Sequence, residues 1–464
     1  MTFVIITASL KHSQYSPFRY GLALGFVAVR EKNDRLLLTA VGQINHGGPQ
    51  AVIDGEQAVV VANLNLDAGK KALSMSDFFA AYSLFNHGIS YLRGGHWEEH
   101  YDLSLELFNL AMKCALSNAE HENFKALAGQ VMQNAKCFED KCQAISASIT
   151  LFGLTGNVAE AVELINSTLT NLGEGLPTII TPNDFKHHLD STKELLASLS
   201  DDALLSYPVM TNPSKILVLE LLAKQHQLLP FVEDRDAVLT IPLKLIQISL
   251  MNGMSPMSPV GFALYGNYLA LVRNEFEEGY RYVKLALSLM KKSPSRAHDG
   301  NIMFQSNYTK LYVEPMQSAI ELYPDAIRAA MKSGNPVATT VACIYGNLCF
   351  WSGKELKAVV FSMEETIRET KYHKNLNVLR IILPVFRMIL RLMGEPGEPQ
   401  QDHDQVTAIR GKSKGDVTGK HASYFHSLFF VRLSEALIFR ELDKAKDAAK
   451  EFFLLTKNST TLLL

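Results

Sequence analysis

A spacing of small and aromatic residues between Gly69 and Gly88 constrains this chain more than any other feature of its sequence. Gly69 is followed by Ala81 after 12 positions, by Phe85 after 4 more and by Gly88 after 3 more. This spacing is typical of a hairpin of two closely crossing helices, because only glycine or alanine at the crossing lets the backbones approach. A large side chain then fills the space beside the crossing.

Partial copies of this pattern recur along the chain. Gly346 and Ala358 repeat the 12-residue interval, and Ala161 and Gly279 stand at the small position of further second helices. Such positions are separated by multiples of roughly 40 residues, as in helical repeat proteins. A single hairpin buries only one face, so stacked neighbours must complete the core. The sequence therefore predicts an all-α fold, a TPR-like α-solenoid of stacked helical hairpins, with a non-repetitive helical domain as the alternative.

Composition narrows the possible partners. The 464 residues are 47% hydrophobic and 20% charged, with a net charge of −2, which is ordinary for a packed chain. Balanced charge gives no general attraction to nucleic acid or to an acidic membrane. No apolar run reaches the roughly 18 residues that span a bilayer, and the start, MTFVIITASL, is a poor secretory signal. We expect a cytoplasmic protein without nucleic-acid or membrane partners and without a cofactor.

Helix breakers divide the chain into four parts. Residues 1–45 form an ambiguous N-terminal segment, in which 35–41 fits a strand or a helix end equally well. Residues 46–393 carry the helical periodicity of the array, apart from a weak strand-like alternation near its start. Residues 394–421 are polar and glycine-rich, as in a flexible linker, and 422–464 form the last helical hairpin.

Four segments between Gln43 and Leu107 resemble the region after the ATPase module in large predicted signal-transduction ATPases of the STAND or AAA type. The segments are QINHG, NLNLDAGKKA, FFAAYSLFNHGISYL and WEEHYDLSLEL, and the last contains Trp97 and Tyr101. The resemblance extends diffusely to about residue 457, with PVMTNPSK, FALYGNYLA, CFWSGKELKA and LMGEP as further counterparts.

In that family a P-loop ATPase module precedes a tetratricopeptide-like array. Many members also carry a Ser/Thr kinase domain before the ATPase, and GAF, histidine-kinase or nucleotide-cyclase domains after the array. The resemblance implies that this chain is a non-catalytic regulatory or scaffold region that contacts protein segments or ATPase and kinase modules. A free-standing peptide-binding adaptor is the alternative.

The chain departs from the family at the nucleotide site. A P-loop needs G-x-x-x-x-G-K-[ST], because the backbone amides of its turn cradle phosphates. The near match at 69–70 has Leu64 in place of the first glycine, and the near match at 411–413 has Val406 there. Kinase signatures are also absent from the sequence, so we expect this chain not to be an enzyme.

The segment HWEEH fits the H-x-x-E-H pattern of zinc hydrolases. In that interpretation His96 and His100 bind zinc and Glu99 activates water, with a third ligand from elsewhere. The alternative is a helix that buries Trp97 and Tyr101 and leaves the histidines on its wetter face. The resemblance accounts for both aromatic residues without a metal, so we expect no metal site and keep a zinc hydrolase as a remote alternative.

Cysteines and tyrosines allow weaker inferences. Cys137 with Cys142, and Cys343 with Cys349, lack the C-x-x-C spacing of zinc or redox sites and are expected to be core thiols. A group of tyrosines fits either hairpin packing or the lining of a groove that grips a peptide. Its members are Tyr265, Tyr268, Tyr280 and Tyr282.

Overall fold

The computed structural model describes most of the chain, and the described residues are helical almost throughout. They are residues 33–177, 180–229, 235–293, 298–333, 337–372, 376–395 and 422–458, together with 21, 24, 25 and 27. The prediction of an all-α fold is confirmed over this part of the chain. The chain divides into two compact units, Met1–Ala147 and Ser148–Leu464.

Helices of the first unit follow the hairpin order that the sequence predicts. They are α3 (Asp34–Gly47), α4 (Gly55–Ser74), α5 (Phe78–Tyr91), α6 (His96–Glu99), α7 (Tyr101–Ser117) and α8 (His121–Asn134), with a 3₁₀ turn at Pro49–Ala51. Helix α4 packs on α3 and α5, and α7 packs on α5 and α8. The core between them includes Ile44, Val61, Phe85 and Leu107, all of them buried. Helix α9 (Phe138–Thr155) crosses the boundary to the second unit.

Two expectations about the start of the chain are resolved. The described part of the N-terminal segment is a helix, because Asn33 caps α3 by accepting a hydrogen bond from the Leu36 amide at 3.1 Å. The weak strand-like alternation after residue 50 was misleading, since this stretch enters α4. There Asp54 is the cap and accepts from the Glu56 amide at 3.0 Å.

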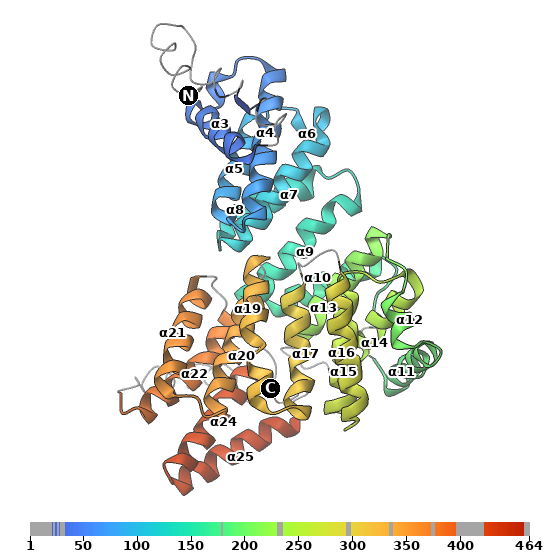
Figure 1. Ribbon diagram of the computed structural model, residues 1–464, viewed down its shortest axis with the longest axis vertical. Helices are drawn as coiled ribbons and strands as arrows, with labels where there is room; N and C mark the ends of the chain where they lie inside the picture. The colour runs from blue at the N-terminus through green and yellow to red at the C-terminus, as the bar shows by residue number, and fades with distance from the viewer. Residues whose placement is uncertain are drawn as a thin grey trace. The chain divides into compact units, whose positions relative to one another are not determined.

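The second unit continues as a succession of helices, coloured from green to red in Figure 1. They are α10 (Val158–Asn171), α11 (Pro182–Ala197), α12 (Asp201–Leu205), α13 (Pro213–Leu228), α14 (Arg235–Asn252), α15 (Ser258–Leu271), α16 (Phe276–Lys292), α17 (Asp299–Val313), α18 (Met316–Ile320), α19 (Tyr323–Lys332), α20 (Val337–Trp351), α21 (Leu356–Tyr372), α22 (Leu376–Leu392), α24 (Ala422–Ile438) and α25 (Leu442–Asn458).

Packing in this unit follows the order of the chain. Helix α16 packs on its own partner α15 and on α17, the first helix of the next hairpin. In the same way α19 packs on α17 and α20, and α21 packs on α20 and α22. Helix α15 also contacts α17 directly. Each hairpin thus completes the core of the one before it, which is the construction of a TPR-like α-solenoid.

Part of the predicted organisation lies outside the described residues. This holds for nearly all of the expected linker 394–421, including the P-loop near match at 411–413. The last hairpin is described as α24 and α25 up to Asn458. Among the described helices, none is both long enough and apolar enough to cross a membrane.

Candidate functional site

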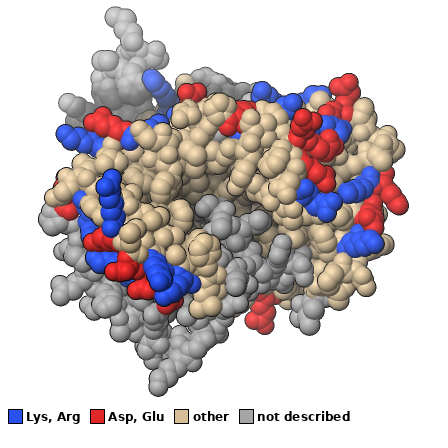
Figure 2. All heavy atoms as spheres, turned by 90° about the horizontal axis from the view of Figure 1, so that it is seen from below, with Lys and Arg blue, Asp and Glu red and all other residues tan. Residues whose placement is uncertain are grey.

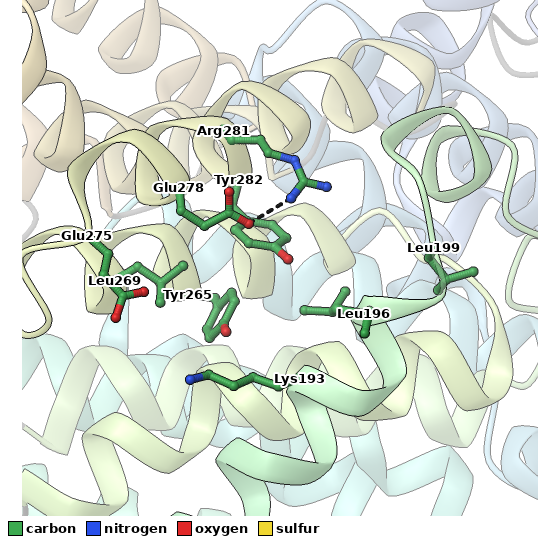
Figure 3. A pocket seen from close by; sticks show the side chains of 10 residues that line it. Lys193, Leu196, Leu199, Tyr265, Leu269, Glu275, Glu278, Arg281 and Tyr282 are labelled. Carbon is green, nitrogen blue, oxygen red and sulfur yellow. Dashed lines mark hydrogen bonds and ion pairs between the residues drawn. The ribbon is translucent and has the colours of Figure 1, made fainter.

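A cavity of about 310 Å³ lies in the second unit between α11, α15 and α16. Figure 3 shows its lining, with Lys193 and Leu196 on α11 facing two tyrosines from the other helices. The lining residues are Lys193, Leu196, Ala197, Leu199, Tyr265, Leu269, Glu275, Glu278, Arg281 and Tyr282. We call this cavity the tyrosine pocket.

Two glycines bring the tyrosines of the pocket together. A Cβ added to Gly266 on α15 would lie 2.6 Å from the Gly279 carbonyl oxygen, and the reverse contact is equally short. No side chain fits there, so α15 and α16 cross in backbone contact. The adjacent side chains Tyr265 and Tyr282 consequently meet edge to face, with ring centroids 5.0 Å apart.

Arg281 holds the rim of the pocket in place. Its Nη2 donates to Asp201 Oδ1 at 2.7 Å and its Nη1 donates to Glu278 Oε1 at 2.7 Å. Asp201 belongs to α12, so the guanidinium ties this short helix to α16. Hydrogen bonding to Asp201 keeps the pKa of Arg281 above its ordinary value. The guanidinium also lies over the Tyr282 ring at 5.1 Å.

The polar groups of the pocket are arranged for binding. Burial raises the pKa of Tyr265 and of Tyr282, so both phenols are neutral hydroxyl groups near pH 7. Glu275 pairs with Arg273 at 3.3 Å, whereas Lys193 is exposed and has no ion pair with any described residue. The described lining contains no histidine, cysteine or serine. It can hold a side chain with an apolar body and a polar end.

Charges on the face drawn in Figure 2 are mixed. Figure 2 shows one face on which blue Lys and Arg side chains lie among red Asp and Glu side chains, mostly towards the edge. The centre of that face is largely covered by uncharged residues where it is described. A mixture of both signs does not make the basic stripe that nucleic-acid-binding surfaces require.

The structure separates the four tyrosines of the sequence analysis into two pairs. Tyr265 and Tyr282 line the pocket. Tyr268 instead packs edge-on against Phe185, with ring centroids 5.8 Å apart. Tyr280 donates a short hydrogen bond to Glu314 on the side of α17. Both interpretations of the tyrosines therefore hold in part: Tyr265 and Tyr282 line a pocket, whereas Tyr268 and Tyr280 pack against neighbouring helices.

All four predicted packing residues of the first hairpin are buried where its helices pack against their neighbours. A Cβ on Gly69 would lie 2.3 Å from Cε1 of the Phe85 ring, so the ring occupies the space that glycine leaves. Ala81 and Phe85 are completely buried. Gly88 faces the next hairpin, where its Cβ would lie 2.8 Å from a methyl group of Leu107.

Trp97 and Tyr101 lie where α6 meets α7. Trp97 is 8% exposed and packs against Phe108 with ring centroids 5.0 Å apart, but its indole nitrogen has no hydrogen-bond partner among the described residues. The Tyr101 hydroxyl donates a short hydrogen bond to Asp140 and accepts one from the Lys136 amide at 2.8 Å. Tyr101 thus fastens α7 to the first turn of α9 and to the loop before it, and Tyr101 is only half-buried.

One predicted packing position is wrong. Ala358 is exposed on α21, and Val359 beside it is buried at 1% exposure. Gly346 is buried and would bring a Cβ to 3.0 Å from Met363 Cγ. The first hairpin has three connecting residues, 75–77, whereas this one has four, 352–355. Because of the extra residue, the position of α21 that faces α20 comes one residue later in the sequence, at Val359 instead of Ala358. Ala161 and Gly279 are buried at the second-helix positions.

The H-x-x-E-H segment does not form one continuous helix. Helix α6 ends at Glu99, and His100 is a non-helical residue before α7 begins. His96 Nδ1 lies 2.8 Å from Ser104 Oγ, and its ring stacks on Phe108. The described residues contain no group of three or more His, Cys, Asp or Glu side chains that could hold a metal.

The cysteines differ in environment. Cys142 and Cys349 are buried free thiols, as is Cys114. Cys137 is exposed, which corrects the expectation that it is a core thiol: it precedes the first turn of α9 and lies in the connection from α8. The side chain of Cys343 lies outside the described residues.

The hairpin order and the glycine crossings define a tetratricopeptide-like helical repeat fold. No protein family matches the chain, and no curated protein matches it. A Rap protein complexed with competence and sporulation factor has 11% sequence identity and a TM-score of 0.48, and the likeness covers 87% of this chain and 99% of that chain. The APC/C hetero-tetramer Cut9–Hcn1 has 14% identity and a TM-score of 0.33, covering 96% and 89%. Similarity at this level does not transfer a partner to this chain.

Most of the pocket could not be found from the sequence. Lys193, Leu199 and Arg281 carry no motif, and Asp201 and Arg281 are 80 residues apart. One available signal was the Glu278–Arg281 pair, since residues three apart on a helix face each other. The other was the cluster of tyrosines around the small residues of α15 and α16.

Proposed function

We propose that the chain is a non-catalytic helical array that binds a protein segment, and that the tyrosine pocket receives one side chain of this segment. The observation that carries the proposal is the combination of an apolar wall, two neutral phenols and an ammonium group that pairs with no carboxylate in the described part of the chain. Leu196, Leu199 and Leu269 contact the body of the entering side chain. Lys193 and the phenolic hydroxyls then bind its polar end.

Rigidity of the pocket supports this function. The Gly266–Gly279 contact and the Arg281–Asp201 pair hold the tyrosines in position before any ligand arrives. A preformed pocket orders little on binding, so more of the interaction energy appears as affinity.

A selection from a displayed peptide library, using the full chain as bait, tests the proposal. Lys193→Glu reverses the charge at the mouth of the pocket without touching the core, and we expect it to weaken selected peptides at least about tenfold. Lys186→Glu is the matched control, because Lys186 is exposed on the same face of α11 two turns earlier and does not line the pocket. Failure to select any peptide, or equal effects of both variants, would contradict the proposal.

A finer proposal concerns the partner. The segments between Gln43 and Leu107 support a region that packs against ATPase and kinase modules and relays or restrains their activity. A solenoid flexes because its contacts are mostly between neighbours, and a bound segment can bias that flexing. Pull-down of isolated ATPase or kinase modules with this chain tests the idea. Peptide binding without any module binding would favour the free-standing adaptor.

A further inference from the structure

The hydroxyl group of Tyr265 lies in the wall of the tyrosine pocket and forms no hydrogen bond with any described residue. The residue is only 3% exposed, and its ring is held by Tyr268 and Tyr282, with ring centroids 6.2 and 5.0 Å away. The ring is therefore fixed by packing, whereas its polar end is not satisfied within the described part of the chain. A buried hydroxyl without a partner costs free energy, and a polar group that enters the pocket relieves this cost.

Lys193 brings a positive charge to the same cavity. In Figure 3 the hydroxyl end of Tyr265 points towards the side chain of Lys193, which lines the pocket from α11. The exposed carboxylates of Asp190 and Glu194 lie nearby on α11, but neither lines the pocket and neither forms an ion pair with Lys193. The ammonium and the phenol both donate hydrogen bonds, and a carboxylate is the acceptor that also neutralises the charge.

The carboxylates at the rim of the pocket are already paired. Glu278 Oε1 accepts a hydrogen bond from Arg281 at 2.7 Å, and Glu275 Oε1 accepts one from Arg273 at 3.3 Å. Asp201 accepts from the same guanidinium as Glu278, at 2.7 Å. Figure 3 shows the Arg281–Glu278 pair on the α16 side of the pocket, across from the ammonium group on α11. An entering carboxylate therefore finds its free cation on α11.

The apolar part of the lining favours one length of acidic side chain. Leu196 and Leu269 line the pocket together with Tyr265, and the cavity of about 310 Å³ has room for a whole side chain. Two methylene groups give glutamate an apolar stem that can lie against these leucines while its charged end reaches the polar groups. Aspartate has only one methylene group and buries less apolar surface.

We propose that the side chain received by the tyrosine pocket is a glutamate of the bound segment, whose carboxylate accepts hydrogen bonds from the Lys193 ammonium group and the Tyr265 hydroxyl. This inference rests on the proposed function, because it names the chemistry of the side chain at the same site. A segment that passes over the pocket presents side chains to it, so its free carboxyl end is not required.

The peptides selected by the full chain test the inference. In the library used, both peptide ends are joined to the display protein, and we expect the selected peptides to share a glutamate at one position. In synthetic copies with blocked ends, changing this glutamate to glutamine should weaken binding at least about tenfold. Selected peptides without a shared acidic residue would overturn the inference and leave the proposed function standing. Binders found only among peptides with free C-termini would also overturn it, and selection of no peptide at all would overturn both.

Two variants test the proposed donors. Lys193→Met keeps the apolar stem but removes the charge, so it should bind the glutamate and glutamine peptides about equally. The matched control Lys186→Met should keep the preference for glutamate. Tyr265→Phe removes only the hydroxyl, and it should weaken the glutamate peptide severalfold without lowering the free energy of unfolding, because the hydroxyl has no partner within the described chain. An undiminished glutamate preference in Lys193→Met, or a loss of stability without a loss of binding in Tyr265→Phe, would refute these roles.

Discussion

The carbonyl oxygen of Gly279 lies where a side chain of Gly266 would begin, 2.6 Å from the Cβ that alanine would add. The contact is mutual and joins backbone to backbone, so neither partner can move aside as a flexible side chain would. It fixes the distance between α15 and α16 and hence the meeting of Tyr265 with Tyr282.

Gly266→Ala should therefore destabilise the protein by about 1–3 kcal/mol, the usual cost of overpacking. Chemical denaturation measures this change. Gly129→Ala is the control: Gly129 lies inside α8 with nothing within 4 Å of its added Cβ, so the variant should gain about 0.5–1 kcal/mol from helix propensity. Similar effects of the two variants would show that α15 and α16 are not in backbone contact.

Gly69 and Phe85 should be coupled. Gly69→Ala is expected to cost about 1–3 kcal/mol because the new methyl group meets the phenyl ring. Once Phe85→Leu has removed the ring, the same substitution should cost less. A double-mutant cycle on the free energy of unfolding measures the coupling, and additive effects would place the ring elsewhere.

His226 predicts a dependence of stability on pH. Burial lowers the pKa of His226 to about 4, below the 6.5 of an exposed histidine. The unfolded state therefore binds a proton more readily between these values, and stability falls as pH drops from about 6.5 towards 4. The loss is at most about 3 kcal/mol.

Urea denaturation of the native chain and of His226→Gln measures this contribution. The variant should lose less stability than the native chain between about pH 7 and about pH 5, because glutamine does not titrate. If the free energy of unfolding changed with pH in the same way in both proteins, His226 would not be the source of the pH dependence.

Among the four cysteines whose side chains are described, thiol labelling of the folded chain should begin at Cys137. Cys137 is exposed, whereas Cys114 and Cys142 are buried and burial raises their thiol pKa values to about 12 and about 11. The thiolate is the reactive form, so the buried pair should react only on unfolding. Mass spectrometry after brief labelling identifies the modified residues. Early labelling of Cys114 would mean that α7 is not packed as described.

Zinc should not copurify in stoichiometric amount. The break at His100 takes the two histidines off a common helix, and His96 already faces Ser104 at 2.8 Å. Elemental analysis of the purified chain is the measurement. One zinc per chain that is lost in His96→Ala would restore the hydrolase alternative.

The sequence by itself determined the helices and the first helix crossing. Periodicity and spacing within a hairpin are local, so Gly69, Ala81 and Phe85 could be assigned from their intervals alone. Tertiary structure decided everything that depends on the length of a connection or on distant contacts. A single extra connecting residue exposes Ala358 and buries Val359. The rim of the pocket is held by Asp201 and Arg281, which are 80 residues apart and meet between α12 and α16. No local pattern encodes such a meeting, because it results from the sum of the angles and lengths of all the elements between.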